Sequence, residues 1–169
     1  MHHTLRHGRS ALVLLVAAFA PLLAVAEKAI INDTAQVYYK SGSQASFSGA
    51  AEYFTGEVKV DMLFPANADA HYGGAYVTFQ PGSRTAWHSH PAGQHMVVTE
   101  GVGLTGTRDG KVITISKGDA LWCPPGVDHW HGATATSAMT HLVVTGSTKA
   151  GNVVWKEQVA EPLYQNAQP

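Results

Sequence analysis

The chain contains little charge and almost no cysteine. Only 14% of its 169 residues are charged, the formal net charge is −1, and neither sign is concentrated in a run. Nucleic acids and other charged polymers are recognised by clustered charge, so the sequence argues against such partners. With a single cysteine, Cys123, an internal disulfide is excluded, and the folded domain must be stabilised by packing alone.

Cys123 has two interpretations. A thiol can act as a soft metal ligand, or it can be a buried structural side chain. Cys123 precedes His129 by six residues, but a Pro-Pro-Gly turn intervenes and breaks the alternation that would aim both side chains at one point. The structural interpretation is therefore favoured.

Long apolar runs are absent after residue 26. The one such run, Ala11–Val25, follows Arg6 and Arg9 and ends in Ala24-Val25-Ala26, which is the pattern of a secretory signal peptide with a small-residue cleavage site. The run is shorter than the roughly 20 residues that span a membrane, which favours cleavage over an uncleaved anchor.

We therefore expect residues 1–26 to be a signal peptide that is removed after Ala26. Residues 27–169 would form the mature protein, periplasmic or secreted, with no membrane attachment after cleavage.

The mature chain shows the two-residue alternation of half-buried strands, as in Gly56–Phe64, where Val58, Val60 and Met62 alternate with charged residues. A loop over 65–74 and a strand over Ala75–Gln80 follow. Further strands are expected at 86–90, 93–100, 102–108, 111–115, 119–123, 129–134 and 138–145, with a helical turn or strand near 153–164. Short strands separated by Gly and Pro turns predict an all-β sandwich or jelly roll.

Two motifs carry the chemistry. The first is Gly82, five residues, His88-Ser89-His90, three residues, Gln94, six residues and Gly101. The second is Gly118, five residues, Pro124-Pro125-Gly126, two residues and His129-Trp130-His131. Residues two apart on a strand point to the same side, so each histidine pair shares a face. Two such strands side by side predict a metal site with these ligands: His88, His90, Gln94 and His129.

The donor set indicates which divalent metal would bind. Imidazole suits many ions, but the amide oxygen of Gln94 favours harder ones such as manganese or iron(II), with zinc and nickel as further alternatives. Four protein ligands leave two positions of an octahedral ion open for substrate or water. Because glutamine is neutral, the ion keeps a charge near +2, which favours acid–base over redox chemistry.

Together the motifs resemble the two signature motifs of the cupins. Gln94 stands where most cupins have glutamate, and Ala133 stands where asparagine is usual. More closely, Arg84–Gln94, His129–Gly132 and Met139–Leu142 resemble small manganese-dependent bacterial cupins with hydroxynitrile lyase activity. The resemblance implies a single cupin jelly-roll β-barrel over residues 27–169, with its metal-binding core at about 75–145.

Two further histidines are candidates for proton transfer. His131 shares the lumen face with His129, and an inward direction on strand 138–145 would bring His141 to the same lumen. In the cupins that the chain resembles, the matching histidines are implicated in catalysis, and the threonine matching Thr85 lies in the pocket. We expect His131 or His141 to act as a general base and Thr85 to orient the substrate. The alternative is that either histidine only hydrogen-bonds the barrel wall.

The remaining expected lumen residues are small or apolar, which describes a pocket for a small, partly hydrophobic molecule: Ala75, Val77, Met96, Val98 and Val143. Trp87, Trp122 and Trp130 flank motif residues and should face the opposite way, as should His95. Apolar residues on outward faces suggest a homodimer or homotetramer.

Three functions remain open. The first is a metal-dependent lyase that cleaves or forms a carbon–carbon bond next to a hydroxyl, as in a cyanohydrin. The second is an iron-dependent cupin dioxygenase, and the third is a non-catalytic exported barrel that binds a metal or ligand. Fold alone does not distinguish them.

Overall fold

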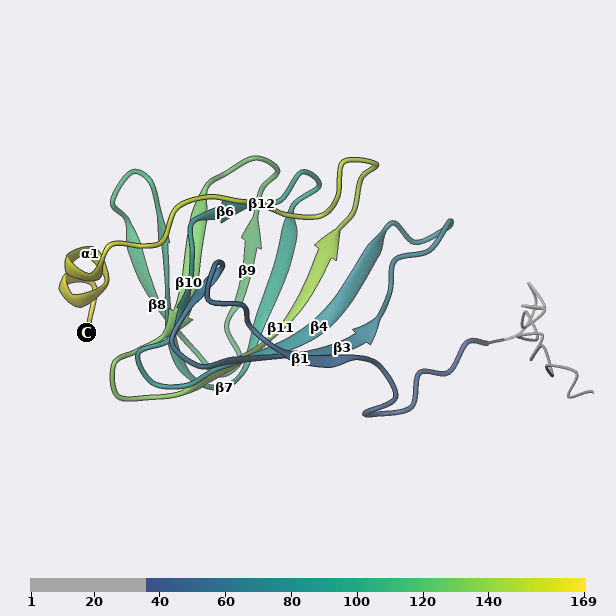
Figure 1. Ribbon diagram of the computed structural model, residues 1–169, viewed down its shortest axis with the longest axis horizontal. Coiled ribbons are helices and arrows are strands. Elements are labelled where there is room, and N and C mark those ends of the chain that lie inside the picture. Colours follow the sequence, from purple (N-terminus) through teal and green to yellow (C-terminus); the bar gives the residue numbers. More distant parts are fainter. Residues whose placement is uncertain (1–35) are drawn as a thin grey trace, which may run out of the picture. The chain divides into compact units, whose positions relative to one another are not determined.

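Antiparallel strands dominate the structure, which is a computed structural model that describes residues 36–169. The expected signal peptide at 1–26 lies outside the described residues. The elements are β1 Ser46–Ser48, β2 Phe54–Thr55, β3 Val58–Phe64, β4 Tyr72–Phe79, β5 Arg84–Thr85, β6 His88–Ser89, β7 Gln94–Thr107, β8 Val112–Ser116, β9 Ala120–Cys123, β10 His129–Ala133, β11 Met139–Gly146, β12 Val154–Trp155 and α1 Glu161–Asn166. The all-β jelly roll predicted from the sequence is confirmed (Figure 1).

The long strand β7 joins the two sheets of the barrel. Its first half pairs with β11 and β9, and its second half pairs with β10 and β8. Gly101 lies between the halves with φ of 72°, and a Cβ at this position would collide with the carbonyl oxygen of Ala138. Only glycine fits this corner without strain. The separate strands predicted at 93–100 and 102–108 are therefore one bent strand.

Other boundaries differ from the sequence prediction for identifiable reasons. The strand predicted at 86–90 is shortened to β6 at His88–Ser89, because the backbone N–H groups of Ala86 and Trp87 donate to Tyr53 and Glu157, which lie outside the strands. The separate strand β5 precedes it. The segment 153–164 contains both a strand and a helix. These differences arise from contacts with distant segments, which local patterns do not report.

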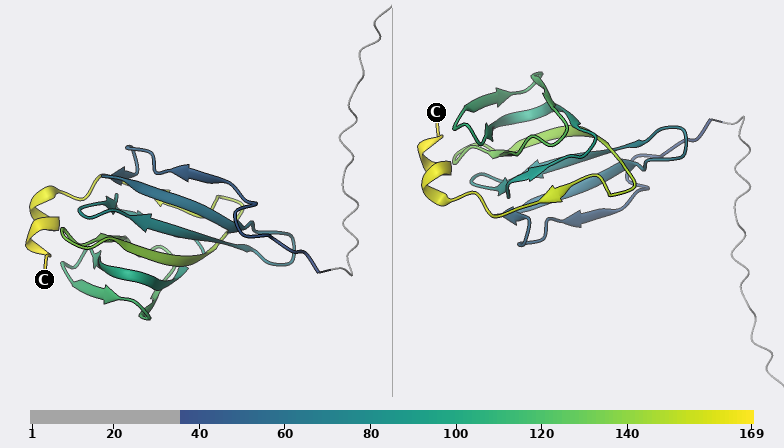
Figure 2. Two further views of the ribbon diagram at one scale, coloured as in Figure 1. Left: turned by 90° about the horizontal axis from the view of Figure 1, so that it is seen from below. Right: turned by 90° about the horizontal axis from the view of Figure 1, so that it is seen from above.

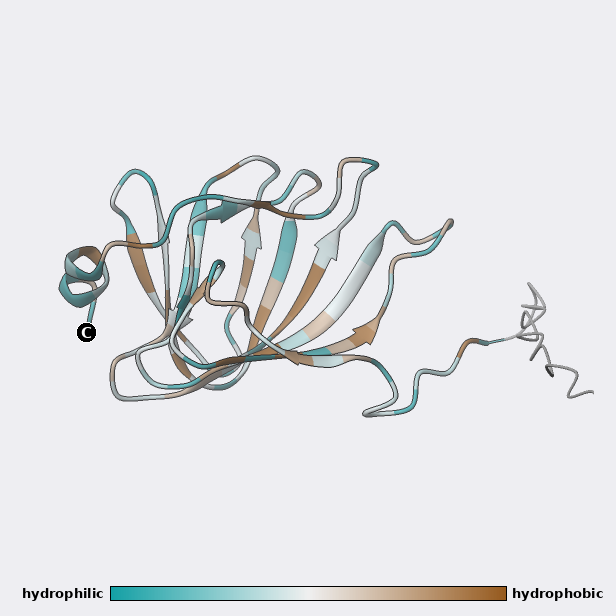
Figure 3. Cartoon of the chain, in the orientation of Figure 1, coloured by the Kyte–Doolittle hydropathy of each residue, from teal (hydrophilic) through white to brown (hydrophobic). Residues whose placement is uncertain are grey.

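The core has two parts on opposite faces of the strands. One part lies inside the barrel, where β3, β4, β7 and β11 contribute Val60, Val77, Met96 and Met139 among others. The other part packs outside β10 beneath α1 and contains Trp87, Trp130 and Tyr164. Trp87 and Trp130 thus face away from the lumen, as predicted. Hydrophobic stretches occupy parts of several strands, next to hydrophilic or intermediate stretches, and the connecting loops are of mixed hydropathy (Figure 3).

Helix α1 is held at one end of the strands (Figure 2). The side chain of Arg84 is 4% exposed, donates to the carbonyl oxygen of Val159 at 3.2 Å, and pairs with Glu161 at 2.7 Å. Its guanidinium lies 4.4 Å from the centre of the Tyr164 ring. These contacts give a buried cation both hydrogen bonds and a π face, so the C-terminal segment is fixed to the sheet.

The outer face of β4, β7 and β9 carries exposed apolar side chains. Tyr76, Val97 and Trp122 are 37%, 37% and 49% exposed, and Trp122 packs on His95 with ring centres 4.5 Å apart. The homodimer or homotetramer expected from such residues stays a prediction. None of the helices in residues 36–169 is long and apolar enough to cross a membrane.

Cys123 is buried, and burial raises the pKa of its thiol to about 11. At pH 8 the folded protein should therefore hold almost no thiolate, which is the reactive form. We predict that a thiol-specific colorimetric reagent labels Cys123 at least about a hundredfold more slowly in the native protein than in guanidinium. Fast labelling of the native protein would contradict a structural role for this cysteine.

Candidate metal centre and active site

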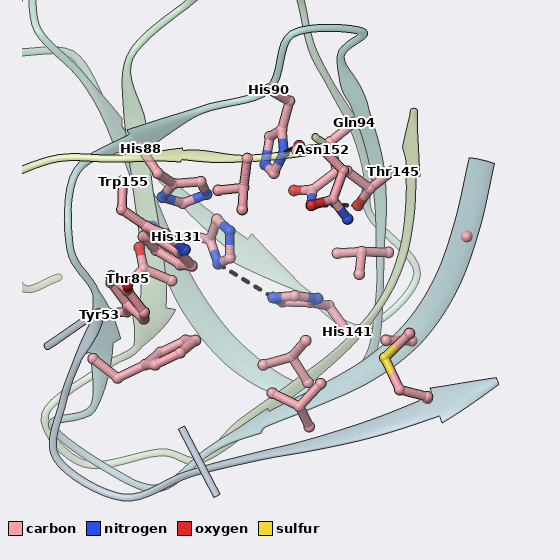
Figure 4. A pocket seen from close by; sticks show the side chains of 18 of the residues that line it. Tyr53, Thr85, His88, His90, Gln94, His131, His141, Thr145, Asn152 and Trp155 are labelled. Atoms are coloured by element: carbon pink, nitrogen blue, oxygen red, sulfur yellow. Dashed lines mark hydrogen bonds between the residues drawn. The ribbon is translucent and has the colours of Figure 1, made fainter. Parts of the chain in front are cut away.

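A cavity of about 420 Å³ is lined by residues of both sheets, including His88, His90 and His131 of the motifs (Figure 4). His129 is not among the residues that line it. This volume is within the roughly 300–1,000 Å³ of small-molecule sites. Among the described residues that line it, none is Lys, Arg, Asp or Glu. The cavity is therefore suited to a small neutral molecule.

Strand pairing brings the two motifs together. In the register of β6 with β10, His88 lies directly opposite His129, and their ring centres are 4.3 Å apart. The ring of His90 lies 5.1 Å from that of His88 and 5.4 Å from that of His129. Gln94, at the start of β7, lines the same cavity. The four residues predicted as ligands thus come from three segments that meet at one end of the barrel.

Backbone carbonyls hold three of the histidine rings in the same tautomer. The Nδ1 atoms of His88, His90 and His129 lie 3.0, 2.7 and 3.0 Å from the carbonyl oxygens of Ala86, Asn152 and Val127. A carbonyl oxygen only accepts, so each Nδ1 must carry the hydrogen and each Nε2 must present its lone pair. This is the arrangement of metal-binding histidines, whose second nitrogen is fixed by a hydrogen-bond acceptor.

The amide of Gln94 is oriented in the same way. Its Nε2 donates to Thr145 Oγ1 at 2.9 Å, which leaves Oε1 as the free atom. Oε1 of Gln94 and Nε2 of His90 and His129 are buried and have no hydrogen-bond partner among the described residues. Buried acceptors without a donor are costly. A divalent cation fits this donor set, because it would satisfy all of these acceptors at once.

Burial keeps the three rings neutral. It lowers the pKa of His90 to about 4 and lowers the pKa of His129 below its ordinary value. The pKa of His88 is held well below the ordinary value by burial and then by the neighbouring His129. A neutral imidazole keeps its lone pair available, so these shifts favour binding of a cation over binding of a proton.

His131 also lies close to these rings but is held differently. Ring nitrogens of His88, His129 and His131 lie within 4.8 Å of one another, close enough together to hold a metal ion among the described residues. However, Nδ1 of His131 contacts no backbone carbonyl and lies 3.2 Å from Nε2 of His141. This difference in partner separates His131 from the three rings that backbone carbonyls hold.

His131 and His141 form a buried pair. They are 4% and 0% exposed, and both pack against the ring of Phe79. Burial and the neighbouring His141 hold the pKa of His131 well below its ordinary value, and burial lowers the pKa of His141 to about 3. Two neutral rings share one hydrogen bond, so the ring that donates keeps a free acceptor nitrogen and the ring that accepts keeps a free N–H. When His131 donates through Nδ1, its Nε2 is that free acceptor.

Thr85 is joined to the same pair. Its side chain is 1% exposed, and its Oγ1 accepts the backbone N–H of His131 at 3.1 Å. The hydroxyl hydrogen remains available for a molecule in the cavity, which Thr85 lines. Thr85 is therefore placed to donate a hydrogen bond beside the histidine pair.

The sequence prediction of the lumen was correct in part. Ala75, Val77, Met96, Val98 and Val143 all belong to the core cluster inside the barrel, and Ala75, Val77 and Val143 line the cavity whereas Met96 and Val98 do not. Several lining residues were missed, among them four that lie outside the two motifs and in segments without alternation: Tyr53, Phe54, Asn152 and Trp155. Trp155 could have been identified as a candidate lining residue from the short apolar run that it forms with Val153 and Val154.

Comparisons with known proteins agree with this geometry. The cupin domain family (Cupin_2) matches residues 75–145. A curated relative named (R)-mandelonitrile lyase, from Granulicella tundricola, is 48% identical over 124 residues, which cover 73% of this chain and 95% of the relative.

Solved structures share the fold. A cupin-like protein from Thermotoga maritima superposes with a TM-score of 0.68 and 36% identity, covering 72% of this chain and 92% of that one. A polyketide cyclase from Streptomyces resistomycificus, 17% identical with a TM-score of 0.58 over 80% of this chain and 99% of its own, is similar in fold. The chain therefore belongs to the cupin superfamily, and within it resembles the hydroxynitrile-lyase-like members.

Proposed function

We propose that the protein is a metal-dependent lyase that cleaves small, neutral hydroxynitriles into a carbonyl compound and hydrogen cyanide, or forms them in the reverse direction. The observation that carries the proposal is the buried His131–His141 pair, which lies beside a group of converging lone pairs in a cavity without charged residues. The relative named (R)-mandelonitrile lyase, at 48% identity, supports a cupin lyase.

The ligands that we propose are His88, His90, Gln94 and His129, with manganese as the metal and iron(II), zinc and nickel as alternatives. The unpartnered acceptors of His90, Gln94 and His129 support this set. When bound, a divalent ion supplies positive charge that attracts the hydroxynitrile and stabilises the departing cyanide. Because Gln94 is neutral, it does not reduce that charge as a glutamate would.

The protein's own residues carry the proton. Cleavage breaks the bond between the carbinol carbon and the nitrile carbon, the electron pair leaves with cyanide, and the hydroxyl proton must go to a base. Nε2 of His131 is neutral, buried and without a partner among the described residues. After it accepts the proton, Nδ1–H of His131 still donates to His141, which stabilises the imidazolium. The same proton then passes to cyanide and gives hydrogen cyanide.

Thr85 and the apolar wall position the substrate. The Thr85 hydroxyl, fixed by the backbone N–H of His131, donates a hydrogen bond to the substrate oxygen or nitrile. Val77 and Val143 line the cavity, so the reacting bond is removed from bulk water.

This function is tested by measuring activity separately with each metal. The purified mature protein is stripped with a chelator and reloaded separately with manganese, iron(II), zinc or nickel. We predict benzaldehyde release from mandelonitrile that depends on manganese and proceeds without oxygen uptake, because the chemistry is proton transfer rather than oxidation. Oxygen uptake confined to the iron form would instead support a dioxygenase. Metal binding without turnover for any metal would support a binding protein.

Replacement of the proposed base should separate catalysis from metal binding. We predict that His131→Ala lowers kcat by at least about a hundredfold, the usual contribution of a general base, while one metal per chain is retained. His141→Ala should lower kcat about tenfold, since it removes only the partner of the base.

The matched control is His71→Ala, because His71 is exposed in the loop before β4. It should leave both kcat and metal content unchanged. Loss of metal in His131→Ala, measured by elemental analysis, would show that His131 is a ligand and would contradict its assignment as the base.

A further inference from the structure

Three aromatic rings form one wall of the cavity, beside the histidine group. We call Tyr53, Phe54 and Trp155 the aromatic wall. The rings of Tyr53 and Trp155 are stacked, with centres 4.8 Å apart and an interplanar angle of 16°, and Phe54 meets Trp155 edge-on at 5.5 Å. All three line the cavity, and Figure 4 shows Trp155 and Tyr53 on the same side as His88 and Thr85.

The wall reaches the reacting centre directly. The ring of Trp155 lies 4.9 Å from the ring of His88, so a substituent packed against Trp155 is adjacent to the proposed metal ligands. A group attached to the reacting carbon itself would fill this space. The cavity is also lined by apolar side chains without rings, including Val60, Met62 and Val77.

The C-terminal segment holds Trp155 in place. Strand β12 pairs with β6, so that Trp155 lies opposite His88, and Figure 1 shows this segment crossing the ends of the neighbouring strands. Lys156 forms an ion pair with Asp128, and its backbone N–H donates to the carbonyl oxygen of Trp87 at 2.9 Å. These contacts fix the position of the ring before a ligand arrives.

A second set of contacts ties the other half of the wall to this segment. The side-chain amide of Gln158 donates to the carbonyl oxygens of Ala51 and Glu52, at 3.1 and 2.8 Å, immediately before Tyr53. Tyr53 and Trp155, which are far apart in sequence, are therefore aligned by the same segment. Both lie outside residues 75–145, which match the cupin family, so the wall is separate from the metal motifs.

We propose that the aromatic wall selects substrates whose reacting carbon carries an aryl ring, with Trp155 as the specificity-determining residue. Aromatic rings prefer the edges and faces of other rings over saturated groups of the same shape. The cavity has no charged lining residue among those described, so the ring must belong to a neutral molecule. The inference rests on the proposed lyase function for the identity of the reacting group, but not for the recognition of the ring.

Binding without turnover tests the recognition alone. Ligand-observed NMR with the manganese-loaded protein compares benzyl alcohol with cyclohexylmethanol, which has the same shape but no π system. We predict that benzyl alcohol binds roughly threefold to tenfold more tightly. Trp155→Leu should abolish this preference, whereas Trp155→Phe should keep most of it. The control is Trp122→Leu, at an exposed tryptophan outside the cavity, and it should behave as the wild type.

Kinetics then test specificity in the reaction. The paired substrates are mandelonitrile and the cyanohydrin of cyclohexanecarbaldehyde. Trp155→Leu should lower kcat/KM for mandelonitrile about threefold to tenfold, chiefly through KM, and should change that of the cyclohexyl substrate less than about twofold. Melting temperatures of the variants report whether each is folded. If Trp155→Leu is not folded, the inference is still tested by Trp155→Phe, which should keep most of the preference for the aryl substrate.

The outcomes distinguish the two proposals. Equal binding of the two alcohols by the wild type, or an aryl preference that survives in Trp155→Leu, overturns the inference even if mandelonitrile is cleaved. An aryl preference that depends on Trp155, in a protein without cyanohydrin turnover, overturns the lyase function and supports the aryl site.

Discussion

Several buried hydrogen-bond acceptors lie without a partner among the described residues of the barrel, and the architecture around them fixes their orientation. Nε2 of His90 and His129 and Oε1 of Gln94 have no partner among the described residues. Leaving a buried acceptor unpaired costs about 1–3 kcal/mol. The fold tolerates this cost because the acceptors are fixed from behind, by backbone carbonyls in the case of the rings and by Thr145 in the case of the amide. The proposed divalent cation would bind these acceptors and remove that cost, and the free energy recovered would contribute to metal binding.

The histidines of the site differ in the hydrogen-bond partner of their Nδ1 atoms. A ring whose Nδ1 faces a backbone carbonyl can only offer Nε2 as a lone pair, which suits a metal ligand. The ring of His131 faces His141 instead, so its proton can move between two neutral imidazoles. This difference of one hydrogen bond divides the cluster into proposed ligands and a proposed base, although all of the rings are buried and uncharged at neutral pH.

Much of the barrel could be predicted from the sequence because its causes are local. The alternation of Val58, Val60 and Met62 predicted β3, and the spacing of the two motifs predicted that His88 and His129 share a lumen. The bend of β7 at Gly101 could not be predicted, because it depends on the approach of Ala138 from another strand. The aromatic wall could not be predicted from the sequence for the same reason. Tyr53 and Trp155 are 102 positions apart, and only the folded C-terminal segment brings their rings together.

The most direct test of this account is the position of the metal. Crystals of the manganese-loaded protein without residues 1–26, measured by anomalous diffraction, should show one strong peak per chain in the cavity. We predict that it lies within about 2.5 Å of Nε2 of His88, His90 and His129 and of Oε1 of Gln94. A peak bonded to His131 instead of His90 and Gln94, or no peak in the barrel, would contradict the division of the histidines into ligands and base.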